Sequence, residues 1–304
     1  MREPTPQIPQ PQLILNNKEI QQTDTTDIIS IKNIATAVEK LQKDKTPGLS
    51  AIPIKYYYWG GQDMYQILHK WYKIIEKHQY TPKSLNASII APLQKSDTSA
   101  SMIIKQDPKQ YRPIALQNSM YKILDGCIKQ EIEKHDELNQ IIEINQGGFK
   151  QKEGTIEQLY ALQNIVHYNS NHCCAFLDLS KAHDTVNRNK LFLKLTKQHK
   201  LNNNTINLLK AMYTDAQICT RIDDKISPLD YTRNGLQQGA LSSPILNLYI
   251  NDLIQKLNKQ NIGATFNTTG QKNKLKINSL LFADDIMLAE NPTKLQRLLR
   301  ICTE

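Results

Sequence analysis

Apolar residues recur every three or four positions in several segments of the chain, which is the spacing of an amphipathic helix. The first segment begins at Ile31 and stops before the helix-breaking pair Pro47-Gly48. Another begins at Thr155, where Gln158 completes a capping-box pattern. The spacing predicts helices at residues 31–41, 63–78, 120–134, 155–168, 189–198, 205–213, 243–259 and 291–302. We interpret these apolar stripes as faces that pack in a core.

Short apolar runs bounded by polar or turn-forming residues predict strands. One run covers residues 87–93, and residues 217–232 have the pattern of a hairpin with its turn at Asp223 to Lys225. A third run ends at Asp178. A carboxylate at the end of a strand is well placed to line a cleft.

Two adjacent acids lie at the tip of the last predicted hairpin. Apolar runs at 280–282 and 286–288 flank Ala283, Asp284 and Asp285. Asp is common in turns because its side chain bonds to nearby backbone, so turn structure explains this pair equally well when it is taken alone.

The chain divides into a lead-in and a folded part. Residues 1–29 are rich in Pro, Gln and Thr, which predicts an extended segment. The remainder is long enough for about two domains, at roughly 150 residues each. Between two predicted elements, the polar loop 96–110 is long enough to be functional or disordered.

The charge balance indicates an anionic partner. The chain has 38 Lys and Arg against 29 Asp and Glu, a formal charge of +9. Nucleic acid is the simplest partner, and a solvated lysine-rich surface is the open alternative. The sequence contains no apolar run long enough to span a membrane and no secretory signal, so we expect an intracellular protein that is not secreted. Its five cysteines include no C-x-x-C pair, which argues against a zinc module or a disulfide framework.

The acids become informative in combination with one another. Asp178 ends a strand, Asp284 and Asp285 occupy a hairpin tip, and carboxylates gathered in one cleft repel each other unless a cation neutralises them. Oxygen ligands without a His or Cys set favour Mg²⁺ or Mn²⁺. Two such ions about 4 Å apart activate a 3′-hydroxyl and stabilise a leaving pyrophosphate, which is polymerase chemistry.

Six motifs then resemble, in order, those of non-LTR (LINE-type) retrotransposon reverse transcriptases, and the chain is also similar to group II intron reverse transcriptases. The similarity spans nearly all of residues 31–304. The motifs are LQKDKTPGLSAI, APLQK with YRPI, QGGFKQKEGTIEQL, AFLDLSKAHDTV, NGLQQGALSSPILNLYI and LFADD.

The resemblance implies an α+β, right-hand polymerase fold. Residues 30–170 would form the fingers with part of the palm, and residues 171–304 the palm, with an antiparallel sheet flanked by helices. The implied activity is RNA-directed DNA synthesis, with an RNA template, a DNA primer and dNTP as partners. The alternative is an inactive or incomplete remnant that acts as a nucleic-acid-binding or structural subunit.

The resemblance also assigns roles to individual residues. Asp178, Asp284 and Asp285 match the palm acids that bind two Mg²⁺ or Mn²⁺ ions, with Asp285 in support. Lys95 and Arg112 match fingers residues that hold the triphosphate.

Gln238 and Gly239 match the turn that lies along the nucleotide and template. Structural explanations stay open for two of these residues: Arg112 could form a salt bridge within the fingers, and Gln238 could simply be a turn residue.

The sequence departs from the family pattern at several positions. His183 stands where the family has Phe or Tyr, which predicts weaker exclusion of a 2′-hydroxyl, unless the flat imidazole ring has adequate bulk. Asn247 in place of Phe is peripheral to the metals and suggests drift of the sequence from the family pattern. The chain ends at Glu304, soon after Asp285, so the resemblance predicts that the thumb is absent and that this is either a fragment or a short relative completed by another chain. Nuclear residence is plausible for such an enzyme.

Overall fold

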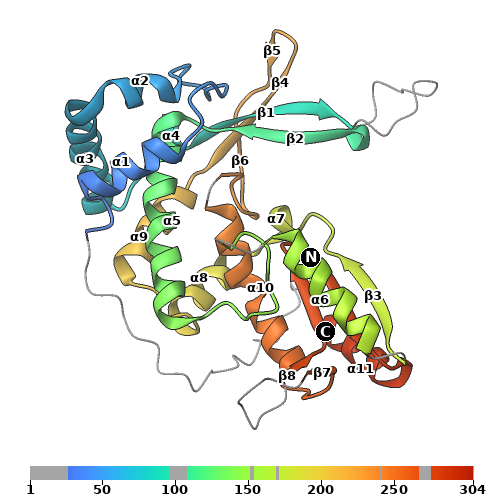
Figure 1. The fold of residues 1–304 in the computed structure, drawn as a ribbon. Helices are drawn as coiled ribbons and strands as arrows, with labels where there is room; N and C mark the ends of the chain where they lie inside the picture. The colour runs from blue at the N-terminus through green and yellow to red at the C-terminus, as the bar shows by residue number, and fades with distance from the viewer. Residues whose placement is uncertain are drawn as a thin grey trace, which may run out of the picture.

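Helices and strands alternate along the computed structural model, which describes residues 27–95, 108–150, 154–168, 171–239, 241–266 and 275–303. The fold is mixed α/β (Figure 1). Most of the predicted lead-in 1–29 and of the predicted loop 96–110 falls outside the described residues. Ile28 and Ile29 are buried, so packing begins before Ser30.

The helices predicted from apolar spacing are all present, with ends that differ by a few residues. Those described are α1 (Ile31–Lys40), α2 (Ile54–Trp59), α3 (Gly61–His78), α4 (Lys83–Asn86), α5 (Ser119–Asn139), α6 (Thr155–Tyr168), α7 (Ala182–Thr185), α8 (Arg188–Lys197), α9 (Asn203–Tyr213), α10 (Ser242–Asn258) and α11 (Pro292–Thr303), with a 3₁₀ turn at Pro108–Gln110. In α1, the Ser30 hydroxyl accepts the Asn33 N–H at 3.1 Å and caps the helix. The sequence did not predict α2, α4 and α7, because these helices are too short to show a helical period of apolar residues.

The larger sheet is mixed. Its strands are β1 (Ala87–Gln94), β2 (Tyr111–Leu116), β4 (Gln217–Ile222), β5 (Lys225–Ile226) and β6 (Asp230–Tyr231), in the order β2-β1-β4-β5 with β6 paired to β4. β1 and β2 are antiparallel, whereas β1 and β4 are parallel. Pro92 lies opposite Pro113. Since neither proline has an N–H, this pair occupies a non-hydrogen-bonded position, and the Pro113 carbonyl points to the free edge of β2.

The second sheet is antiparallel and has three strands, β3 (Cys173–Asp178), β10 (Asp285–Glu290) and β9 (Ser279–Phe282), in that order. Its residues alternate between two faces. Leu281, Ile286 and Leu288 join the main core, whereas Leu280 and Met287 pack with α6. A separate antiparallel pair comprises β7 (Ala264–Phe266) and β8 (Leu275–Ile277).

A shared core joins the two halves of the chain. Buried residues from Ile28 to Leu298 form one cluster, and β4 pairs with β1 across the proposed boundary at residue 170. In Figure 1, α5, α8, α9 and α10 lie below the larger sheet. Of the described helices, none combines the length and apolarity that crossing a bilayer requires.

A buried histidine in this core predicts an acid-sensitive fold. His199 is 4% exposed, and its Nε2 bonds to the Leu248 carbonyl at 3.0 Å. Burial lowers its pKa to about 4. The neutral form is therefore favoured in the folded protein, and stability that is complete above the unfolded pKa of about 6.5 is lost as the pH falls toward 4. The expected loss from this group at pH 5 is about 2 kcal/mol.

Urea unfolding at pH 7.5 and pH 5.0 measures this loss. His199→Gln keeps an N–H donor and does not titrate, so its free energy of unfolding should fall by about 2 kcal/mol less than that of the wild type. Equal losses in the two proteins would show that His199 is not responsible.

Candidate active site

Two of the predicted acids lie opposite each other on neighbouring strands of the three-stranded sheet. Asp178 is the last residue of β3, Asp285 is the first residue of β10, and the register places them directly opposite one another. Opposed residues on antiparallel strands project from the same face, with Cβ atoms about 5 Å apart. Both side chains are exposed. Asp284 precedes Asp285 in the turn and is half-buried.

The observed turn of this hairpin is one residue shorter than the sequence predicted, because Asp285 belongs to the strand. Asp285 pairs with Phe282 and belongs to the ladder, so Ala283 and Asp284 alone form the turn. Across the residues that the structure describes, no three His, Cys, Asp or Glu side chains gather closely enough to hold a metal ion. The site is a carboxylate pair with a third acid in the adjoining turn.

The donor set of this pair fits a divalent cation. Within the described residues, neither Asp178 nor Asp285 takes part in an ion pair. Two opposed carboxylates repel each other, and a hard cation with oxygen ligands relieves that repulsion. Mg²⁺ commonly uses one or two protein carboxylates and completes its octahedron with water and phosphate oxygens.

An apolar hollow of about 460 Å³ adjoins the carboxylate pair. Asp178 and Asp285 contribute to its lining, together with residues of α6, β3, β9 and β10. Phe176 and Leu159 in this lining are 71% and 63% exposed. The acids are therefore open to a large substrate.

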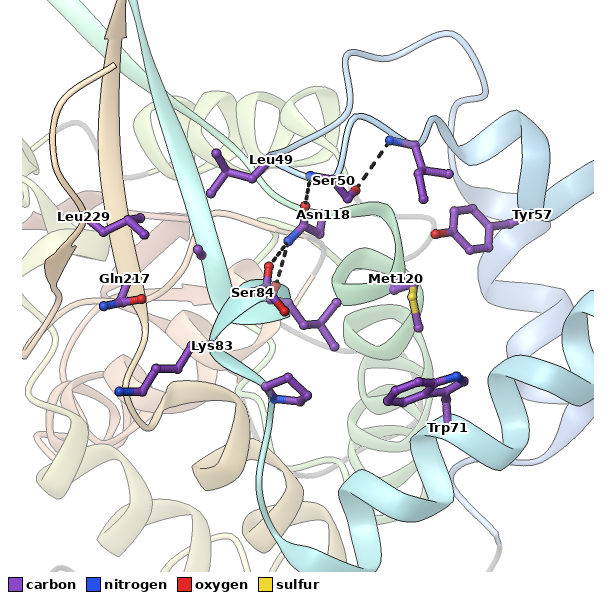
Figure 2. Close-up of a pocket in the computed structure, with 14 residues that line it drawn as sticks. Leu49, Ser50, Tyr57, Trp71, Lys83, Ser84, Asn118, Met120, Gln217 and Leu229 are labelled. Atoms are coloured by element: carbon purple, nitrogen blue, oxygen red, sulfur yellow. Dashed lines mark hydrogen bonds between the residues drawn. The ribbon is translucent and has the colours of Figure 1, made fainter.

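A second cavity, of about 690 Å³, lies elsewhere in the fold and includes none of the predicted site residues (Figure 2). Asn118 organises its wall: its Oδ1 accepts the Ser50 N–H at 2.8 Å, and its Nδ2 donates to the Ser84 carbonyl at 2.6 Å. Gly48 packs against the backbone at Gln117, where a Cβ would come within 2.5 Å of the Gln117 carbonyl carbon. The TPGLS sequence is thus explained by close packing on the start of α5.

Gln238 connects the turn before α10 to the larger sheet. Its Oε1 accepts the Ala115 N–H at 2.7 Å, and its Nε2 donates to the Pro113 carbonyl at 3.1 Å. The amide therefore binds the free edge of β2 as the peptide of another strand would. Its expected contact with a nucleotide stays a prediction.

Gly239 lies where only a small residue fits. A Cβ there would come within 2.7 Å of Asp125 Oδ2 and 2.9 Å of Gln117 Oε1. Asp125 is buried, and its Oδ2 accepts the Leu241 N–H at 3.0 Å. The structure thus explains the glycine at this position by its close approach to buried side chains.

The two predicted triphosphate ligands share one end of the β1–β2 hairpin. Arg112 lies opposite Leu93 and is exposed. Lys95 follows β1, is exposed, and donates its N–H to the Gln110 carbonyl at 2.9 Å. Figure 1 shows this end of the hairpin projecting from the body of the fold.

His183 lies in α7, just after the strand that carries Asp178. It is half-buried, and its carbonyl accepts the Leu236 N–H at 2.8 Å. This bond fixes the backbone at His183 to the segment that leads into Gln238.

Sequence reasoning missed Arg188, which organises that same segment. Its guanidinium donates to backbone carbonyl oxygens of Tyr213, Thr232, Asn234 and Gly235. Burial lowers the pKa of this guanidinium. No local sequence pattern predicts that this arginine bonds to carbonyl oxygens of residues 213–235, which are distant from it in the chain.

Comparisons with known proteins find reverse transcriptases. The family model described as "Reverse transcriptase (RNA-dependent DNA polymerase)" matches residues 103–304. The chain is 25% identical over 230 residues to "Probable RNA-directed DNA polymerase from transposon BS" of Drosophila melanogaster, covering 72% of this chain and 24% of that protein. It is 31% identical over 116 residues to "Retrovirus-related Pol polyprotein from type-1 retrotransposable element R2" of Popillia japonica, covering 38% and 18%.

A third relative is "RNA-directed DNA polymerase from mobile element jockey" of Drosophila funebris, 26% identical over 226 residues and covering 72% of this chain and 24% of that protein. The chain spans less than a quarter of the length of each of these relatives. These similarities confirm the resemblance to non-LTR reverse transcriptases. Because the family model covers well over half of its residues, the chain belongs to the reverse transcriptase (RNA-dependent DNA polymerase) family.

Proposed function

We propose that this chain is the catalytic core of an RNA-directed DNA polymerase that extends a DNA primer on an RNA template. The opposition of two exposed acids, Asp178 and Asp285, inside the region matched by the family model carries the proposal. In this assignment the larger sheet with α1 to α4 forms the fingers, which then include β4 to β6 from the segment 171–304 that the sequence assigned to the palm. The three-stranded sheet with α10 and α11 forms the palm.

The acids would hold the divalent metal. Asp178 and Asp285 would supply oxygen ligands from one face, and Asp284 would supply another from the turn. Bound Mg²⁺ or Mn²⁺, as two ions, would stabilise the charge that develops on the attacking and leaving oxygens.

Other residues of the chain would bind and orient the substrates. Arg112 and Lys95 are exposed cations at one end of a hairpin, and they suit triphosphate oxygens. The turn at Gln238 and Gly239 would lie along the incoming nucleotide. The overall charge of +9 favours association with the phosphates of template and primer.

Primer extension tests the proposal. The purified chain is mixed with a DNA primer annealed to RNA, one complementary dNTP and Mg²⁺, and the proposal expects addition of that nucleotide that stops when EDTA removes the metal. Salt-dependent RNA binding by folded protein without any incorporation would overturn it and favour a nucleic-acid-binding subunit.

The sugar preference of the same reaction depends on His183. Phe in this position is larger and apolar, so His183→Phe is expected to raise discrimination against ribonucleotides by about tenfold. Single-nucleotide incorporation with dNTP and with rNTP, in both proteins, measures this. Equal discrimination would mean that the imidazole ring already excludes the 2′-hydroxyl.

A further inference from the structure

The turn that carries Asp284 has backbone groups that its own hairpin does not satisfy. Ala283 has φ 59°, in the left-handed region, and is only 7% exposed. Buried N–H and C=O groups require partners, and a turn in this conformation cannot place both within a strand ladder. The partner has to come from another segment.

Gln146 supplies both bonds. Its Oε1 accepts the Ala283 N–H at 3.1 Å, and its Nε2 donates to the Ala283 carbonyl at 3.2 Å. The same Oε1 accepts the Gly148 N–H at 2.9 Å. Gln146 is fully buried, so water does not compete for these groups.

The segment around Gln146 is also paired with β9. The Leu281 N–H donates to the Asn145 carbonyl at 2.8 Å, and the Gly147 N–H donates to the Leu281 carbonyl at 2.9 Å. Residues 141–148 thus form a strap along the hairpin that holds Asp284 and Asp285.

Three asparagines of α10 fasten this strap from its other side. Asn247 Nδ2 donates to the Gly148 carbonyl at 2.7 Å, and Asn251 Nδ2 donates to the Ile141 carbonyl at 2.8 Å. Asn258 Nδ2 donates to Asn145 Oδ1 at 3.1 Å.

These asparagines lie four and seven residues apart and therefore on one face of α10. Asn247, which the motif comparison had suggested to be drift, is one of these anchors. The helix α10, which begins after the Gln238 turn, thus also holds the strap against the hairpin that carries Asp284 and Asp285.

We propose that Gln146 is a positioning residue of the polymerase reaction, whose side-chain amide fixes the Ala283–Asp284 turn and so holds the metal-binding acids against Asp178. The inference rests on the proposed function. Residues that orient metal ligands without touching the metal typically change metal affinity or activity 10- to 100-fold when replaced.

The test measures metal binding directly as well as turnover. The full chain is titrated with Mn²⁺ and the free ion is followed by electron paramagnetic resonance. Gln146→Leu is expected to bind Mn²⁺ at least tenfold more weakly than the wild type and to lose at least tenfold in turnover. KM for dNTP and the Kd for primer–template should stay unchanged, because the Gln146 side chain is fully buried and bonds to the backbone of Ala283 and Gly148.

A glutamine that bonds to α1 and α5 rather than to the hairpin provides the matched control. Gln130 Nε2 donates to the Asn33 and Gly126 carbonyls, at 3.0 and 3.1 Å, far along the chain from the acids. Gln130→Leu removes comparable backbone bonds and should bind Mn²⁺ as the wild type does. If Gln146→Leu does not fold, Gln146→Glu replaces it with the same expected result, because the carboxylate cannot donate to the Ala283 carbonyl.

The two proposals fail in different ways. A wild type that binds Mn²⁺ and incorporates nucleotide, together with a Gln146 variant that matches it in both, overturns the inference alone. A wild type that neither binds Mn²⁺ nor incorporates nucleotide overturns the proposed function and the inference with it.

Discussion

Replacing Asp178 with asparagine is expected to stabilise the protein while reducing Mg²⁺-dependent nucleotide incorporation by ~10³-fold or more. Asp178 lies directly opposite Asp285, and like charges in that position destabilise a sheet by about 0.5 kcal/mol. The amide removes this repulsion and keeps the shape of the side chain. It also removes a charged metal ligand, so the transition state loses several kcal/mol of electrostatic stabilisation.

Thermal unfolding and primer extension on the same preparations measure the two effects. Mg²⁺ should raise the melting temperature of the wild type and leave that of Asp178→Asn unchanged, because a ligand stabilises only the protein that binds it. Asp224→Asn makes the same chemical change in an exposed turn and serves as the control. A variant that is less stable than the wild type, or that keeps its activity, would show that the two carboxylates do not share a site.

The sequence predicts this pair only in part. The apolar runs show that Asp178 and Asp285 both lie at strand ends, and the family resemblance brings them to one site. Their exact opposition depends on register, which the alternation of Leu177, Ile286 and Leu288 toward the core determines. A slip of one residue would turn every side chain of β10 to the other face.

Contacts between distant segments were beyond prediction from the sequence for a different reason. The helical period at Ile34 and Val38 is visible because those residues share one helix face. The parallel pairing of β1 with β4 joins strands that are far apart in the chain, and no local pattern marks it. The same holds for Gln238 on the edge of β2, where the sequence predicted contact with substrate and the structure shows a bond to a strand.

Gly148 belongs to a motif that the sequence shows but whose structural role the sequence does not explain. The QGGF sequence matched the family pattern, but its physical basis lies in a hairpin more than a hundred residues later in the chain. Gly148 packs directly against the backbone of Ala283, beside the acids.

Gly148→Ala is therefore expected to cost about 2–3 kcal/mol of stability and about 100-fold in nucleotide incorporation. A Cβ at this position would overlap the backbone nitrogen of Ala283. Backbone in a paired turn cannot move aside cheaply, so the whole turn with Asp284 has to shift. A displacement of about 1 Å at a catalytic group is enough for a loss of that size.

The neighbouring glycine separates this effect from the general cost of placing alanine in the segment. At Gly147 the added Cβ would meet the side-chain amide of Gln158, which can rotate away. Gly147→Ala should thus retain most of the stability and activity, as judged by urea unfolding and single-nucleotide incorporation. Equal losses in the two variants would mean that the segment, rather than its contact with Ala283, limits the reaction. A stable but inactive Gly148→Ala would show that the hairpin shifts to make room for the methyl group and that this shift displaces the acids.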